Sequence, residues 1–286
     1  NHAQRILDAV RSSGERKFEA DALRLRGDAN WKRGKYKAAE RDYLEALKIA
    51  EAMGDSRGLA HIVHNLGNVY ADQGQFNVAL AYYQRALTIN RSGGEISNVG
   101  KSLLNVGLVH LQSGNYAASL AFLDSAASIF DKISDSTNLG TTLVYIGTTY
   151  NALANYPMAL EYLEKGLHLA RDTKDTFSVA VVYASMGDVQ LNLGNYTRGL
   201  QYHLKASSIF QMIRNPYNVS ASYTNIGAIY RLLGDYDKAL DWYRRALSLK
   251  EEIGEQYRIG ITLGNIGDIY LEQDSLGEAL SYFRHS

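Results

Sequence analysis

The sequence predicts an all-α fold, a solenoid of about seven helix-turn-helix units stacked along the chain. Glycines recur every 40 residues, as from Gly27 to Gly67, with no insertion up to Gly267. Between them, apolar residues recur at spacings of three and four, which is the pattern of a helix with one buried face. The 286 residues include 25 glycines and only 2 prolines, a composition typical of helices with regular stops.

Further columns of residues share this period. A second glycine column begins at Gly34 and an aromatic column begins two residues later, at Tyr36. Two columns of small residues begin at Ala39 and Ala46. Because one such unit cannot bury its apolar face alone, the pattern predicts that neighbouring units stack.

Each unit is expected to contain two helices. In the second unit, Leu66 and Tyr70 belong to one apolar face, and Gly74 follows where a left-handed C-terminal cap belongs. The glycine inside the first helix, Gly67 here, costs about 1 kcal/mol of helix propensity. We therefore expect it to lie where the two helices cross, against Ala79. Residues placed to cap first helices with a side-chain oxygen are Asp55, Asp135, Asp175 and Asn215.

The whole chain, residues 1–286, is predicted to be one solenoid domain. Residues 1–14 align with the end of a second helix, and neither end of the sequence shows the polar capping helix of a complete solenoid. We expect the chain to be part of a longer protein. The expected units span about 15–54, 55–94, 95–134, 135–174, 175–214, 215–254 and 255–286.

Composition argues against several kinds of partner and site. Lys plus Arg and Asp plus Glu each number 30, so the net charge of zero provides no global attraction to nucleic acid or an anionic membrane. No apolar run approaches the roughly 20 residues of a membrane span. The absence of cysteine excludes disulfides, thiolate metal sites and a cysteine nucleophile. We expect no nucleic-acid or membrane partner, no cofactor, and a cytoplasmic location.

One local motif points to a different function. Gly100, Lys101 and Ser102 could end a phosphate-binding loop of the form G-x-x-x-x-G-K-[ST], but the first glycine of that pattern falls on Glu95. The preceding segment has the pattern of a helix rather than a strand. Gly100 also belongs to a column of small residues near the start of each first helix. We therefore interpret it as a packing position.

The repeated motif resembles the tetratricopeptide repeat, in the second unit and equally in residues 225–247 and 265–283. Its residues in the second unit are Leu66, Gly67, Tyr70, Ala79, Tyr83 and Ala86. The spacing exceeds the common one of about 34 residues and is similar to that of kinesin light chains, Leu-Gly-Asn-repeat adaptors and bacterial signalling proteins. The resemblance implies a right-handed superhelix. Its first helices would line a concave groove that binds peptides or partner proteins, without catalysis in the repeats.

Several positions depart from this motif. Arg26 and Asn30 stand where apolar or aromatic residues belong, so the first unit is degenerate. His110 and His203 occupy aromatic columns and are expected in the core. Asp274 replaces a capping glycine.

Asparagines recur at one position of the expected groove, as Asn65, Asn105, Asn225 and Asn265. An asparagine amide can both donate to and accept from an extended backbone, and the family resemblance implies that role, so we predict that these four contact a bound peptide. The alternative is that they bond only to a neighbouring helix or to water. Flanking residues predicted to take part are His61, His64, Asn68, Lys101, Tyr145 and Arg231.

Other chemistry receives little support from the sequence. His61 and His64 lie three residues apart, compatible with a shared metal, but no third ligand is evident and we expect no metal site. No Ser-His-Asp arrangement is evident, so we predict no catalytic residue and no enzyme activity. The predicted function is recognition of a peptide or protein segment, as a sensory or scaffolding part of a larger protein. The alternatives are end-to-end self-assembly, or a peptide or small-ligand sensor that regulates an effector domain.

Overall fold

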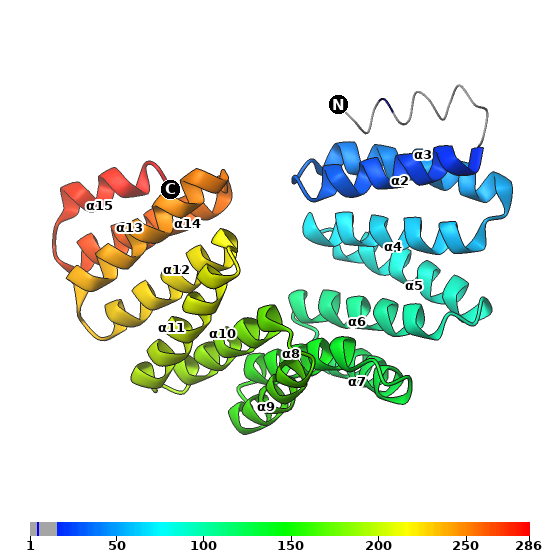
Figure 1. Cartoon of the computed structure of the whole chain (residues 1–286). Helices are drawn as coiled ribbons and strands as arrows, with labels where there is room; N and C mark the ends of the chain where they lie inside the picture. The colour runs from blue at the N-terminus through cyan, green and yellow to red at the C-terminus, as the bar shows by residue number, and fades with distance from the viewer. Residues whose placement is uncertain (1–4, 6–15) are drawn as a thin grey trace. The chain divides into compact units, whose positions relative to one another are not determined.

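The computed structural model describes residue 5 and residues 16–286, so the helix end predicted over residues 1–14 lies almost entirely outside the described residues. Residues 16–286 form an all-α solenoid of successive helix pairs, as predicted (Figure 1). The helices are α2 (Arg16–Trp31), α3 (Tyr36–Met53), α4 (Ser56–Asp72), α5 (Phe76–Ser92), α6 (Ile96–Gln112), α7 (Tyr116–Lys132), α8 (Ser136–Ala152), α9 (Tyr156–Asp172), α10 (Thr176–Asn192), α11 (Tyr196–Met212), α12 (Pro216–Leu232), α13 (Tyr236–Ile253), α14 (Gln256–Glu272) and α15 (Leu276–Phe283).

The chain divides into two compact units, Asn1–Thr149 and Tyr150–Ser286, with the boundary inside α8. Within the first unit, α2 packs on α3, α4 on α5 and α6 on α7, and the second helices α3 and α5 also pack on the next first helices, α4 and α6. The second unit repeats this arrangement from α9 to α15. The single-domain organisation and the right-handed superhelix stay predictions.

The predicted helix ends are confirmed. Gly74 adopts a left-handed conformation, with φ of 71°, and Asp274 adopts the same conformation where other repeats have glycine, with φ of 57°. The side-chain oxygen of Asp55 accepts a hydrogen bond from the backbone N–H of Gly58 at 3.0 Å. Equivalent caps are made by Asp135, Asp175 and Asn215. Each first helix so capped has one of its free N–H groups satisfied.

The glycine inside a first helix lies at a close approach, as at Gly67, Gly187 and Gly227. At Gly199, which stands in the Ala79 column, an added Cβ would lie 3.3 Å from the carbonyl oxygen of Gly187, so the predicted crossing of the two helices is confirmed there. At Gly67 the nearest neighbour is instead the ring of Tyr83, which a Cβ would meet at 2.6 Å. The column therefore accommodates a buried aromatic ring of the second helix as well as the helix crossing.

Replacing Gly67 by alanine is expected to lower the free energy of unfolding by about 1–3 kcal/mol, because the buried Tyr83 ring must shift. A matched control is Gly264→Ala in α14, where an added Cβ meets nothing within 4 Å. That substitution should stabilise the protein by up to about 1 kcal/mol through helix propensity. Chemical denaturation of the two variants measures both effects, and equal effects of the same sign would contradict this packing.

The Gly-Lys-Ser motif lies within α6, and a Cβ on Gly100 would come within 2.8 Å of the Phe130 ring. The interpretation of Gly100 as a packing position is confirmed. The side chain of Ser102 is buried and donates to the backbone carbonyl of Asn98 at 2.9 Å, while Lys101 is exposed. Ser102 is thus turned into the protein, whereas a phosphate-binding loop would present its hydroxyl to the ligand.

The departures in the first unit form a polar network inside the core. Arg26 donates two hydrogen bonds to the carboxylate of Asp42, at 2.9 and 2.7 Å, and Asn30 donates a third at 2.9 Å. The side chain of Asp42 is fully buried. In the next repeat, the equivalents of Asn30 and Asp42 are Tyr70 and Tyr82, whose rings stack with centroids 5.4 Å apart. One hydrogen-bonded cluster therefore replaces an aromatic pair.

Candidate functional site

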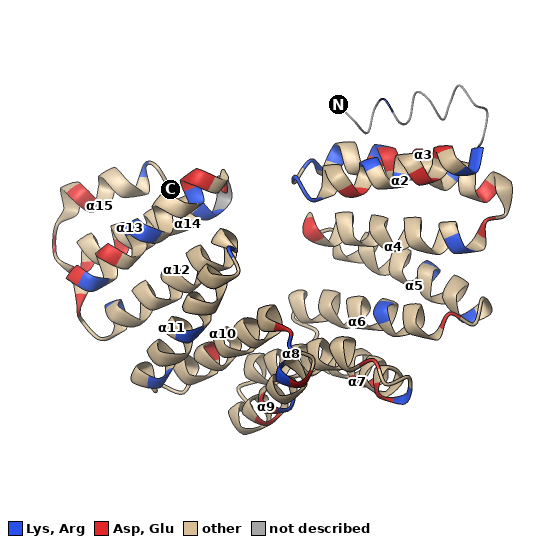
Figure 2. Cartoon of the chain, viewed as in Figure 1, with Lys and Arg blue, Asp and Glu red and all other residues tan. Residues whose placement is uncertain are grey.

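Three of the first helices contain few charged residues (Figure 2). Helix α8 carries no Lys, Arg, Asp or Glu, while α10 and α12 carry one such residue each, Asp188 and Arg231. The second helix α13 is far more highly charged. The helices α8, α10 and α12 therefore offer mainly hydrogen-bonding groups and few charges, whereas α2 is highly charged.

Three of the predicted asparagines bond to the first helix of the preceding repeat. The Nδ2 groups of Asn65, Asn105 and Asn225 donate to side-chain oxygens located 37 residues earlier, at distances of 2.8, 3.1 and 3.2 Å. The acceptors are Asp28, Asn68 and Asp188. The alternative prediction, that these amides bond to a neighbouring helix, is therefore correct for one hydrogen bond of each of the three asparagines. Their contact with a peptide stays a prediction, as it does for the half-buried Asn265.

A side chain of a second helix also reaches each of these three contacts between repeats, here called inter-repeat joints. Asp28 also accepts from the hydroxyl of Tyr43 at 2.6 Å, and Asn68 accepts from that of Tyr83 at 2.6 Å. In the third joint, His203 Nε2 lies 3.3 Å from Asp188 Oδ1. His203 is fully buried, as predicted. The acceptors Asp28, Asn68 and Asp188 belong to no sequence motif that would predict this role. The feature that they share is their position 37 residues before the asparagine that donates to them.

The predicted residues His61, His64 and Lys101 line one small cavity in the first unit. Its volume is about 110 Å³, and Ala60 and two asparagines complete its lining. The asparagines are Asn90, at the C-terminal end of the second helix α5, and Asn98, in the first turn of α6. Neither asparagine is predicted from the sequence, because both lie near helix ends and not in the middle of a first helix.

The cavity is lined by several hydrogen-bonding side chains and by one cation, Lys101. Burial, reinforced by the neighbouring His61 and Lys101, lowers the pKa of His64 to about 4, so this ring is neutral at pH 7. Asn105 Nδ2 lies 3.1 Å from His64 Nε2; because an amide nitrogen only donates, Nε2 is the acceptor and Nδ1 carries the hydrogen. Burial and the nearby Arg24 lower the pKa of His61 as well. Such a cavity suits carbonyl or carboxylate oxygens.

The remaining predicted residues lie elsewhere along the chain. Asn68 accepts the hydrogen bond from Asn105 in the second inter-repeat joint. Tyr145 is half-buried, and burial raises the pKa of its hydroxyl. Arg231 belongs to the second unit, where its Nη1 donates to Asp268 at 3.0 Å and its Nε lies 3.9 Å from Glu272. The structure thus places three of the predicted residues around one cavity and the others along the first-helix surfaces of the two units.

The described part of the chain has neither a metal-binding cluster nor a membrane-spanning helix. It contains no cluster of three or more His, Cys, Asp or Glu residues that could hold a metal ion. None of its helices combines the length and apolar character needed to cross a membrane.

The family follows from a comparison of the sequence with models of known families. The model of the tetratricopeptide repeat matches residues 18–92, 98–172, 178–252 and 220–286, which together cover most of the chain. The chain belongs to the tetratricopeptide repeat family. A comparison with curated proteins found no match.

Solved structures show the same tetratricopeptide fold. Aspartyl phosphate phosphatase F from Bacillus subtilis superposes with a TM-score of 0.75 at 16% identity, covering 97% of this chain and 72% of that one. The apo form of RapI gives 0.71 at 19% identity, with coverages of 94% and 96%. The Rap conjugation gene regulator of plasmid pLS20, in complex with the Phr* peptide, gives 0.62 at 14% identity, with coverages of 82% and 74%. At these identities the likeness establishes the fold alone.

Proposed function

We propose that this tetratricopeptide repeat chain recognises a peptide or protein segment on its first-helix surface, as a sensory or scaffolding part of a larger protein. The observation that carries the proposal is the cavity lined by His61, His64 and Lys101. It combines donors from three helices, and its lining contains no acidic residue. An oxygen of the bound segment, from a carbonyl or a carboxylate, is the group that it would accept.

The fold of related structures supports this proposal. The Rap conjugation gene regulator has been solved with a bound Phr* peptide and shares this chain's fold. Recognition of this kind needs no reacting group, and the proposal assigns no catalytic residue.

Exposed and buried residues have different parts in the proposed site. Lys101 and His61 are exposed and would contact the segment directly, while His64 is held by Asn105 and shapes the cavity. Further contacts along the first helices would come from the amides of the asparagine column. The proposed additional contact residues are Asn65, Asn68, Asn105, Tyr145, Asn225, Arg231 and Asn265.

The test uses peptides selected from a random display library on the wild-type chain. Their affinity is then measured for His61→Ala/Lys101→Ala, which removes two exposed donors without touching the inter-repeat joints. We expect a loss of about tenfold or more, the size of one or two charge-assisted hydrogen bonds.

A matched control removes two exposed lysines from second helices of the same unit, Lys48→Ala/Lys132→Ala, and should leave binding unchanged. Peptides that bind both double variants as well as the wild type would contradict recognition at this cavity. This test is cleaner than replacing the asparagines, because Asn65→Ala would also break the 2.8 Å bond to Asp28 that joins two repeats.

A further inference from the structure

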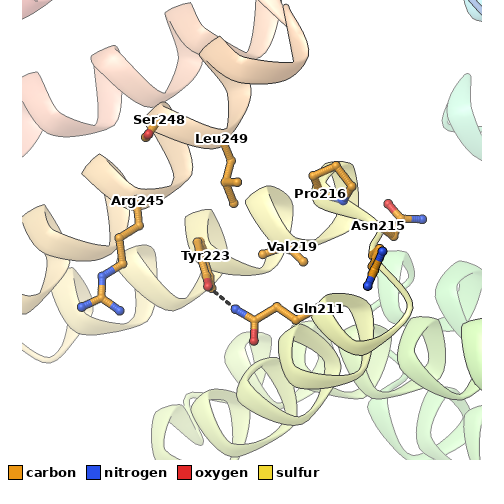
Figure 3. A pocket seen from close by; sticks show the side chains of 9 residues that line it. Gln211, Asn215, Pro216, Val219, Tyr223, Arg245, Ser248 and Leu249 are labelled. Carbon is orange, nitrogen blue, oxygen red and sulfur yellow. Dashed lines mark hydrogen bonds between the residues drawn. The ribbon is translucent and has the colours of Figure 1, made fainter.

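A larger pocket lies on a different surface, within the second unit. It has a volume of about 630 Å³ and opens between the end of α11, the first turns of α12 and the last turns of α13 (Figure 3). Its walls come from two second helices and the first helix between them, so it is separate from the first-helix cavity of the other unit.

The floor of this pocket is apolar and firmly packed. Val219 is almost fully buried in a core cluster with Phe210, and Tyr223 and Leu249 pack against the same cluster. The Tyr223 hydroxyl accepts a hydrogen bond from the Gln211 amide, which fixes the ring at one side of the pocket (Figure 3). The volume is within the range of roughly 300–1,000 Å³ typical of small-molecule sites, which combine an apolar lining with a few polar groups.

The preceding repeat differs in the place of one cation. There, the amine of Lys205 lies 5.6 Å from the ring centroid of Tyr183 and 5.7 Å from that of Tyr202, the equivalents of Tyr223 and Trp242. The equivalent of Lys205 is Arg245, whose guanidinium lies over the Trp242 ring at 4.8 Å. In this repeat Tyr223, Leu249 and Arg245 all line the pocket.

The charged groups of the pocket are both cationic. Arg214 and Arg245 line it, and no acidic residue does. Among the residues described by the structure, Arg214 forms no ion pair, while Arg245 pairs with Asp241 at 2.9 Å across two half-exposed side chains. Such an exposed pair is weak, and a guanidinium has five N–H donors, so Arg245 can also bind a second anion.

We propose that this pocket binds a small amphipathic carboxylate. Its aromatic or branched body would lie on Val219, Tyr223 and Leu249, and its carboxylate would be bound by the guanidinium of Arg214 or of Arg245. This pocket is separate from the cavity lined by His61, His64 and Lys101, because none of its residues belongs to α4, α5 or α6.

Trp242 provides a direct reporter for the test, since its ring lies 4.9 Å from that of Tyr223. The chain contains only two tryptophans, so Trp31→Phe leaves Trp242 as the sole one. We would titrate this full-length variant with phenylpropionate and with phenylpropionamide, which differ only in the charged head group. The expected result is a saturable change of fluorescence with the carboxylate and at least about tenfold weaker binding of the amide.

The location is tested in the same background with Arg214→Gln/Arg245→Gln, which should abolish the preference for the carboxylate. The matched control, Lys174→Gln/Lys205→Gln, removes the equivalent charges of the preceding repeat and should keep the preference. Circular dichroism confirms that each variant is folded. Equal binding of the two probes, absence of a saturable change, or an undiminished preference in the arginine variant would each overturn the proposal.

Discussion

Replacing Arg26 by leucine is expected to lower the free energy of unfolding by about 3–5 kcal/mol, the cost of leaving one partner of a buried ion pair without the other. Asp42 is fully buried and receives two of its hydrogen bonds from Arg26. Its remaining hydrogen-bonding partner is Asn30, and Arg41 lies at 3.8 Å. The leucine would therefore bury an almost uncompensated carboxylate, although leucine is the residue that the next repeat has at this position, Leu66.

The triple variant Arg26→Leu/Asn30→Tyr/Asp42→Tyr tests the reason for this loss. It restores the apolar residue and the stacked aromatic pair of the second repeat, where Tyr70 and Tyr82 meet at 5.4 Å. Because replacing a buried ionic cluster with well-packed apolar groups is often neutral or stabilising, we expect the triple variant to be at least as stable as the wild type. Urea denaturation measures both variants. A triple variant as unstable as Arg26→Leu would contradict the claim that an aromatic pair can replace the hydrogen-bonded cluster of Arg26, Asn30 and Asp42.

Replacing Lys250 by methionine is expected to stabilise the protein by about 2–3 kcal/mol at neutral pH. Only 3% of this lysine is exposed, and its amine donates to the hydroxyls of Thr224 and Thr262 at 2.9 and 2.6 Å, with no carboxylate among these partners. Burial, together with the nearby Arg258, lowers its pKa from 10.5 to about 8. Both threonine hydroxyls also donate to backbone carbonyls, so they keep a partner in the variant.

The gain should depend on pH in a defined direction. Below pH 8 the amine is protonated in the folded and unfolded states, and the folded state carries the full cost of the buried charge. Between about pH 8 and 10.5 the unfolded state binds more protons, so the stability of the wild type rises with pH and the advantage of methionine shrinks. Thermal denaturation of the wild type and the variant at neutral pH and near pH 10.5 measures the difference in stability at each pH. The exposed control Lys48→Met should show little change at either pH, and a gain at Lys250 that does not vary with pH would contradict the buried-charge explanation.

The periodic features of the fold could be predicted from the sequence because they repeat seven times. Glycines, caps and the helix pairs follow from spacing, and the structure confirms them at Gly74 and Asp55. The first unit is harder to predict. The sequence shows Arg26 and Asn30 as departures from the motif, but their hydrogen-bonding partner Asp42 lies in another helix. The one sign of Asp42 in the sequence is that it stands where other repeats have an aromatic residue.

The candidate site was predicted only in part, for a physical reason. His61, His64 and Lys101 were selected for their place on a helical surface, which spacing determines. Which side chains are already engaged in hydrogen bonds depends on contacts between repeats, and Asn65 illustrates this through its bond to Asp28. The pocket of the second unit depends on the side-chain direction of Arg245, which no residue pattern specifies.

The most direct test of first-helix recognition is site-specific photocrosslinking with the display-selected peptides. A photoreactive amino acid would replace Asn98, which lines the proposed site but is not one of its proposed contact residues, or Lys48, an exposed position on a second helix of the same unit. The proposal predicts a peptide crosslink from position 98, competed by unlabelled peptide, and none from position 48. A crosslink from position 48 with none from position 98 would contradict it and place recognition on the second helices.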